Sequence, residues 1–103
     1  MNTRKSPTLA FLEGLTGGLV SFGKLIEAIR LGEDMTQPEF ARRLRISKSH
    51  LNDIEKGRKA VSPERAARYA KILGYSKERF VALSLQDMVD QAGLRLKVDV
   101  KAA

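Results

Sequence analysis

Hydrophobic side chains recur with the spacing of a single helix face along most of the chain. The first clear run follows Ser21 and places apolar residues at positions i, i+3, i+4 and i+7: Phe22, Leu25, Ile26 and Ile29. A serine directly before such a run favours a helix N-cap. The pattern therefore predicts a helix that ends between Gly32 and Asp34. A weaker run over residues 7–15 predicts a short helix within an N-terminal extension, residues 1–20.

Two short helices are predicted next, separated by a turn. Residues 36–39 (Thr-Gln-Pro-Glu) have the composition of a capping box, in which Thr36 accepts from the first turn and Glu39 reaches back. Ser47 is the expected cap of the second helix, and Gly57 its end. The apolar stripes of the two helices are Phe40, Ala41 and Leu44 in the first, and Leu51 and Ile54 in the second.

Two longer helices complete the pattern. Residues 62–64 (Ser-Pro-Glu) supply a cap, a proline at the first helical position and an acid in the first turn. The helix that follows is expected to bury Ala66, Ala67, Ala70 and Leu73 and to end at Gly74. The last helix runs from Ser76 to Gly93, with core positions at Phe80, Val81, Leu83 and Met88. These elements predict an all-α fold with one domain over residues 21–93.

The tail, residues 94–103, has a different pattern. Apolar and charged residues alternate with a period of two, and the apolar ones are Leu94, Leu96, Val98 and Val100. This alternation predicts a β-strand. A single strand needs a partner, which is another part of the chain, a second copy or a different protein.

Composition narrows the function classes. The chain has 103 residues, 43% of them hydrophobic and 30% charged, which is typical of one soluble globular domain. It has no cysteine and only one histidine, so we expect no disulfide, no metal site and no cofactor. No nucleophile constellation or phosphate-binding loop is present, and we expect no enzymatic activity. No transmembrane run or signal peptide is evident, so we expect a cytoplasmic protein without a membrane partner.

The positive charge is concentrated in one segment. The net charge is +7, and residues 42–59 hold seven basic side chains against two acidic ones. Within this segment, one face of the second short helix carries only polar side chains, here called the polar face: Lys48, Ser49, Asn52, Asp53 and Lys56. Such a face fits a DNA major groove, where lysine can donate to guanine, asparagine can pair with adenine and aspartate can accept from cytosine. An ordinary solvated helix has the same appearance, and the face alone leaves both interpretations open.

The order of residues 36–57 resembles the helix-turn-helix of the lambda-repressor-like family (Cro/C1, or XRE). The marks of the resemblance are Gln37, Ala41, Leu44, Ile46, Ser47, Leu51, Ile54 and the Ile-Glu-x-Gly ending at residues 54–57. It extends over about residues 22–83. The resemblance implies a bundle of about five helices that binds double-stranded DNA, usually as a dimer on a palindromic operator.

The resemblance also implies roles for individual residues. Base reading falls on the start of the second short helix, at Lys48, Ser49 and Asp53, with Asn52 beside them. An acid facing DNA repels phosphate unless it reads a cytosine, so a solvated or arginine-paired role for Asp53 stays open. Phosphate contacts fall on Gln37, His50, Lys56, Arg58 and Lys59. Arg30 and Glu55 occupy positions of a structural ion pair. One residue departs from the family: Arg45 stands where glycine is usual at positive φ, at a cost of about 1 kcal/mol, and its guanidinium is placed to reach a phosphate.

Three biological roles remain open from the sequence. Single-domain proteins of this kind resemble antitoxins of type II toxin–antitoxin pairs, which repress their own transcription, and the tail strand would then dimerise the protein or join a toxin's sheet edge. The alternative is a stand-alone phage- or plasmid-type repressor, in which the tail serves only dimerisation. An interaction protein that kept the fold without binding DNA is the third, and the basic segment disfavours it.

Overall fold

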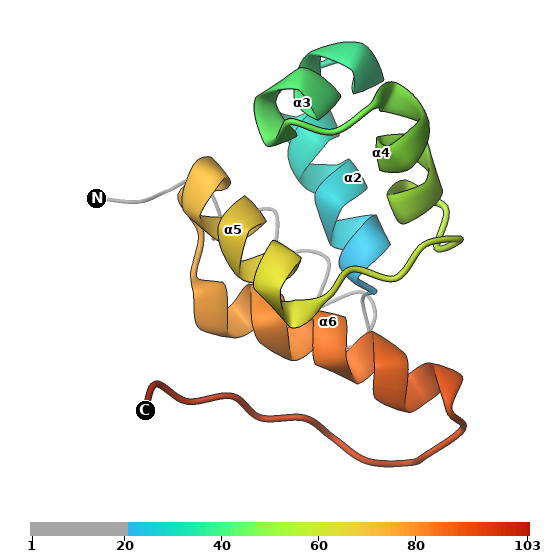
Figure 1. Cartoon of the computed structure of the whole chain (residues 1–103), viewed down its shortest axis with the longest axis vertical. Coiled ribbons are helices and arrows are strands. Elements are labelled where there is room, and N and C mark those ends of the chain that lie inside the picture. Colours follow the sequence, from blue (N-terminus) through green and yellow to red (C-terminus); the bar gives the residue numbers. More distant parts are fainter. Residues whose placement is uncertain (1–20) are drawn as a thin grey trace. The chain divides into compact units, whose positions relative to one another are not determined.

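The computed structural model describes residues 21–103, which fall into two compact units divided between Lys59 and Ala60. Within these residues there are five helices and no strand, so the predicted all-α class and the number of helices are confirmed (Figure 1). The expected helix at residues 7–15 lies outside the described residues.

The first unit contains α2 (Phe22–Gly32), α3 (Gln37–Leu44) and α4 (Lys48–Glu55), and α4 packs against both other helices. The apolar positions predicted for these helices are buried: Phe22, Leu25, Ile26, Ile29, Phe40, Ala41, Leu44, Leu51 and Ile54. Each helix begins where the sequence predicts, because Ser21, Thr36 and Ser47 each accept a hydrogen bond from a backbone N–H of the first turn. At Thr36 the capping box is complete, and hydrogen bonds from Thr36 lower the pKa of the Glu39 carboxyl below its usual value.

A glycine allows α2 and α4 to approach closely. Gly23 is buried at the first turn of α2, and a Cβ atom there would clash with the carbonyl oxygen of Ile54 and press on that of Glu55. The start of α2 therefore lies directly against the end of α4. This contact fixes the end of α4 that carries Asn52 and Glu55.

The turn between α3 and α4 contains the unusual arginine. Arg45 caps α3 in the left-handed conformation, with φ 64° and ψ 41°, which is the positive φ expected at this position. The Ile46 N–H donates to the carbonyl oxygen of Ala41 at 3.0 Å and closes the turn. The side chain of Arg45 is exposed, so the strained backbone buries no charge.

The second unit contains α5 (Pro63–Leu73) and α6 (Lys77–Gln91), which pack against each other. Gly74 ends α5 at φ 79°, as the sequence predicts. Burial differs from the expectation in two places. Tyr69, rather than Ala67, completes the buried face of α5, and α6 buries only Phe80 and Ser84. Met88, which the sequence places in the core, is 40% exposed.

The predicted C-terminal β-strand is wrong. Residues 94–103 have no regular secondary structure and return along α6 as a single run (Figure 1). The physical reason is the lack of a neighbouring strand in the described chain, because a strand is defined by hydrogen bonds to another strand. The side chain of Gln86 on α6 instead bonds the tail at Leu96 and Val98.

Candidate nucleic-acid interface

The polar face predicted for α4 is present on the first unit. Lys48, Ser49 and Lys56 are exposed, whereas Asn52 and Asp53 are half-buried because each bonds a neighbour. Lys48 and Ser49 lie in the first turn of α4, directly after the N-cap Ser47. Lys48, Ser49 and Lys56 are therefore the exposed hydrogen-bonding groups of the polar face, and the first two lie at the start of α4.

Asp53 is held by an arginine. Arg58 Nε donates to Asp53 Oδ1 at 3.0 Å, and the backbone N–H groups of Arg58 and Lys59 donate to the Asp53 carbonyl oxygen at 2.8 and 3.2 Å. Gly57, at φ 76°, makes the reversal that brings the chain back to α4. The pairing neutralises an acid that would otherwise repel phosphate, and it ties the basic loop after α4 to the polar face.

Arg30 and Glu55 form a bidentate ion pair between α2 and α4. The Arg30 Nε–Glu55 Oε2 distance is 2.8 Å and the Arg30 Nη2–Glu55 Oε1 distance is 3.1 Å. The two side chains are only 11% and 3% exposed, respectively. The hydrogen bonds and charge of Glu55 raise the pKa of Arg30, and Arg30 Nη1 also donates to the Met35 carbonyl oxygen. The pair joins the two helices and the loop between α2 and α3.

Gln37 extends this network to the polar face. Its Nε2 donates to Asn52 Oδ1 at 3.1 Å and to Glu55 Oε1 at 3.0 Å. A carboxylate can only accept hydrogen bonds, so the nitrogen of the Gln37 amide must face Glu55. Both N–H bonds of Gln37 are then used inside the protein. Only its carbonyl oxygen remains for DNA, and an oxygen acceptor cannot bond a phosphate oxygen.

A polar hollow of about 240 Å³ opens beside this network on the first unit. Its lining combines two lysines, two glutamates and uncharged groups: Lys24, Lys56, Glu27, Glu55, Ser21, Gln37, Asn52 and Gly57. Glu55 is paired with Arg30, so the two lysines are opposed by Glu27 alone and the lining keeps a net positive charge, which favours an anion.

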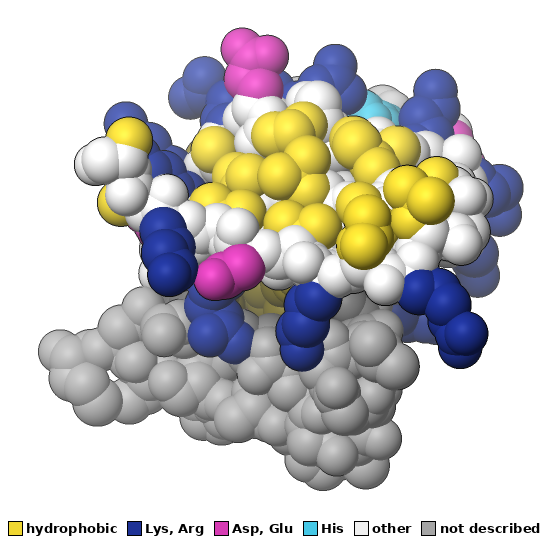
Figure 2. Space-filling model, turned by 90° about the horizontal axis from the view of Figure 1, so that it is seen from below, with side chains coloured by type: hydrophobic (Ala, Val, Ile, Leu, Met, Phe, Trp, Pro, Cys, Tyr) yellow, Lys and Arg dark blue, Asp and Glu magenta, His cyan; other side chains and the backbone are white. Residues whose placement is uncertain are grey.

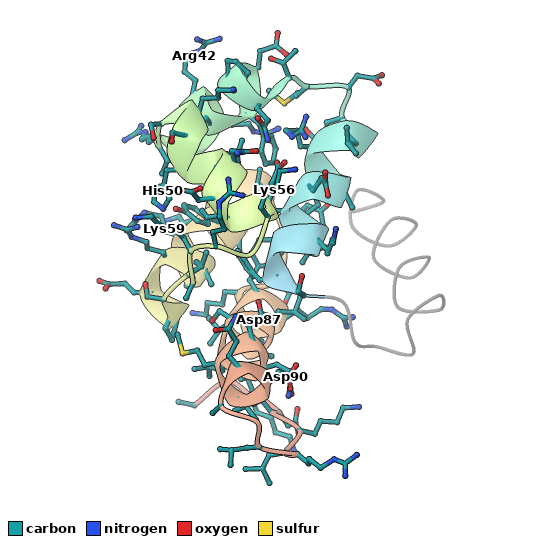
Figure 3. All side chains as sticks on the ribbon, turned by 90° about the vertical axis from the view of Figure 1, so that its right-hand side faces the viewer. Arg42, His50, Lys56, Lys59, Asp87 and Asp90 are labelled. Carbon is teal, nitrogen blue, oxygen red and sulfur yellow. The ribbon has the colours of Figure 1, made fainter. Side chains whose placement is uncertain are left out.

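Both acids in the basic segment, residues 42–59, are paired with arginines, whereas five of its cations have no ion pair with another described residue. Asp53 is paired with Arg58, and Glu55 with Arg30. The cations of this segment without an ion pair within residues 21–103 are Arg42, Arg45, Lys48, Lys56 and Lys59. In Figure 3, His50 and Lys59 extend on the same side of the first unit, while Arg42 lies at the top of the view. The unpaired charge gives the first unit a positive field that favours a polyanion.

The described residues were compared with two other kinds of feature, a metal site and a membrane-spanning helix. No group of three or more His, Asp or Glu side chains in residues 21–103 is arranged to hold a metal ion. None of the helices in this range has the length and apolar character needed to cross a bilayer.

A family comparison agrees with this geometry. The model of the helix-turn-helix family matches residues 26–80, from within α2 to the first turn of α6. The chain belongs to the Cro/C1-type helix-turn-helix family. This family consists of DNA-binding regulators, which are typically not enzymes. No curated protein and no solved structure gives a significant match.

Within this helix-turn-helix protein, sequence reasoning located the polar face but missed how it is supported. It predicted a phosphate contact for Gln37 and a base contact for Asn52, but not the hydrogen bond that joins the two side chains. A weak signal was available: the four residues of the network lie on helix faces that a helix-turn-helix brings together. Lys48, Ser49, Arg45 and Lys56 stay exposed, as a role in binding requires.

Proposed function

We propose that this chain is a sequence-specific repressor that reads double-stranded DNA with the start of α4. The observation that carries the proposal is the exposed pair Lys48 and Ser49 at the first turn of a short helix whose nearby acids are paired with arginines. A lysine there can donate to guanine O6 and N7, and a serine can donate to or accept from a base edge.

The other residues of the interface differ in whether their polar atoms donate or accept hydrogen bonds, and this decides their proposed roles. We assign the phosphate contacts to four side chains with donor groups: Lys56, Lys59, Arg45 and His50. Arg58 shares its charge between Asp53 and the DNA. Asp53 would read a cytosine only after its bond to Arg58 is exchanged, so we assign it a supporting role.

Gln37 and Asn52 act together in this proposal. The hydrogen bond from Gln37 holds the Asn52 carbonyl oxygen, and it leaves the two N–H bonds of the Asn52 amide to point away from Gln37. Asn52 therefore presents donors, which suit acceptor atoms of a base or a phosphate. Gln37 is a positioning residue for Asn52.

The biological role we propose is an autoregulating antitoxin of a type II toxin–antitoxin pair, acting in the cytoplasm as a homodimer on a palindromic operator. The tail supports this role, because Leu94 and Leu96 are exposed and Val98 and Val100 are only half-buried, which leaves apolar surface for a partner. A stand-alone phage- or plasmid-type repressor is the second candidate, favoured if the tail serves dimerisation alone.

The DNA proposal is tested by selecting bound sequences from random duplex DNA at a stated salt concentration. We expect a palindromic consensus. Lys48→Ala should then lose discrimination between consensus and random DNA by about 1–3 kcal/mol. Lys71→Ala, an exposed lysine on α5, is the matched control and should leave discrimination unchanged. Equal weakening on both DNAs would make Lys48 a phosphate contact, and the absence of any enriched sequence would reject the proposal.

The antitoxin role has its own test. The neighbouring gene is expressed alone and together with the gene of this protein, and cell growth is followed. Growth arrest that this protein relieves, together with a stable complex of the two purified products, supports the antitoxin. A harmless neighbour would favour the stand-alone repressor.

A further inference from the structure

The second unit exposes an apolar surface formed by α6 and the tail. Met88, Leu94 and Leu96 are 40%, 52% and 61% exposed, and Val98 and Val100 are half-buried. Figure 2, which looks onto this side of the molecule, shows hydrophobic side chains gathered in one patch with basic side chains around it. Contiguous apolar patches on soluble proteins usually mark interaction sites.

Gln86 fixes the orientation of the tail. Its Nε2 donates to the Leu96 carbonyl oxygen at 2.8 Å and to Asp90 Oδ1 at 2.9 Å, and its Oε1 accepts from the Val98 N–H at 2.7 Å. The Leu94 N–H donates to the Val89 carbonyl oxygen at 3.2 Å and anchors the start of the tail. One amide can reach the carbonyl of residue 96 and the N–H of residue 98 only if both face the same side, as they do in an extended strand.

The opposite edge of the tail has no partner among residues 21–103. In an extended segment, the backbone groups of the odd-numbered residues face away from those of the even-numbered ones. The backbone N–H and carbonyl groups of Arg95, Lys97 and Asp99 make no hydrogen bond within the described residues. This edge is a free template for a strand from another chain.

The sequence of the tail matches itself when reversed about Lys97. In an antiparallel pair centred there, Leu94 faces Val100, Leu96 faces Val98 and Arg95 faces Asp99 in both directions. Every apolar residue meets an apolar residue, and two opposite-charge pairs form. The only like-charge contact joins the two Lys97 side chains, and an Asp99 follows each lysine on the same face. A pair centred on Val98 would also form two Lys97–Asp99 pairs, but it would set Arg95 against Lys101. It would also need the even-numbered backbone groups, two of which Gln86 already bonds.

We propose that the open edge of the tail pairs with the tail of a second copy, antiparallel and in register about Lys97. This inference rests on the proposed homodimer and specifies how it is held together. Gln86 is a positioning residue, because it turns the odd-numbered backbone groups outward. The two strands form a ribbon whose even-numbered side chains share one apolar face.

The test introduces one cysteine at a time. Because the chain has no cysteine of its own, a disulfide-linked dimer then reports that the substituted position lies close to the same position in the second copy. In the proposed register the two Lys97 Cα atoms lie about 5.5 Å apart, within reach of a disulfide, whereas the two Val98 Cα atoms are about 8 Å apart. Lys97→Cys should give a disulfide-linked dimer under mild oxidation at dilute protein concentration, and Val98→Cys should give much less. Three results would overturn the proposal: preferential linkage of Val98→Cys, linkage of neither variant, or linkage of the Lys97→Cys thiol to a co-expressed partner instead of a second copy.

Gln86→Ala in the Lys97→Cys background tests the positioning role. The linked fraction should fall, and the dissociation constant of the dimer should rise about tenfold as the tail loses two hydrogen bonds. Gln91→Ala, an exposed glutamine on the same helix, is the matched control. Unchanged linkage in Gln86→Ala, with unchanged helix content, would remove Gln86 from the proposal.

Sedimentation of the unmodified chain distinguishes failure of the tail pairing from failure of the homodimer. A dimer whose Lys97→Cys variant does not link, or one that persists when residues 94–103 are deleted, overturns the tail pairing and leaves the homodimer standing. A monomer overturns both. The selection from random DNA tests the DNA-binding proposal independently of either result.

Discussion

Replacing Arg30 with methionine is the most direct test of how the interface is supported. The change keeps the side-chain volume but leaves the Glu55 carboxylate, which is 3% exposed, with Gln37 as its remaining side-chain donor. Removing one partner of a buried ion pair costs about 3–5 kcal/mol, because the other charge stays buried without compensation. A domain of this size is stable by only about 5–15 kcal/mol, so Arg30→Met should shift unfolding strongly.

The magnitude is measured by urea unfolding followed by circular dichroism at neutral pH. Arg43→Met is the matched control, since Arg43 and Glu33 form a more exposed pair, with side chains 29% and 23% accessible. Pairs with this exposure contribute about 1 kcal/mol or less. The double variant Arg30→Met, Glu55→Met removes both charges and should be more stable than Arg30→Met alone.

Three results would refute this reasoning. The first is an equal cost for Arg30→Met and Arg43→Met, which would mean that burial does not govern the pair. The second is additivity in the double variant, which would mean that the two side chains are not coupled. The third is unchanged DNA discrimination in a folded Glu55→Met protein, since Gln37 would then hold Asn52 without help from Glu55.

The remaining predictions concern backbone approach, a buried hydroxyl and the basic loop. Gly23→Ala should destabilise the fold by about 2–4 kcal/mol in urea unfolding, because its Cβ meets the Ile54 carbonyl; a change below about 0.5 kcal/mol would show that α2 and α4 separate freely. Tyr69→Phe should stabilise by up to about 1 kcal/mol, because the buried Tyr69 hydroxyl has no hydrogen-bond partner in the described structure. Burial raises the pKa of Tyr69 above its usual 10, so the unmodified protein should lose stability as the pH rises past 10 and Tyr69→Phe should lose less; equal losses would contradict this. Changing Arg58 and Lys59 together to alanine should weaken binding to all DNA sequences and flatten its salt dependence, and an unchanged slope would exclude both from the phosphate contacts.

The sequence by itself determined the helices and where they begin. Ser21, Thr36, Ser47, Ser62 and Ser76 each cap a helix at the predicted position. A cap joins residues two or three apart, so its energy depends on local sequence rather than on the rest of the fold. The positive φ at Arg45 and Gly74 is equally local, and the exposed lysines of α4 follow from helix periodicity.

Only the tertiary structure decided which polar atoms of the interface are free. Gln37 bonds Asn52 and Glu55, fifteen and eighteen residues away in the sequence, and no local pattern indicates that its N–H bonds are used there. Alternation in the tail predicted a strand, but pairing depends on a neighbour, and the neighbour within the described chain is the amide of Gln86. Periodicity predicts which way a side chain points. Whether its hydrogen-bonding groups then find partners depends on packing between segments far apart in the chain, and this packing is set by the fold as a whole.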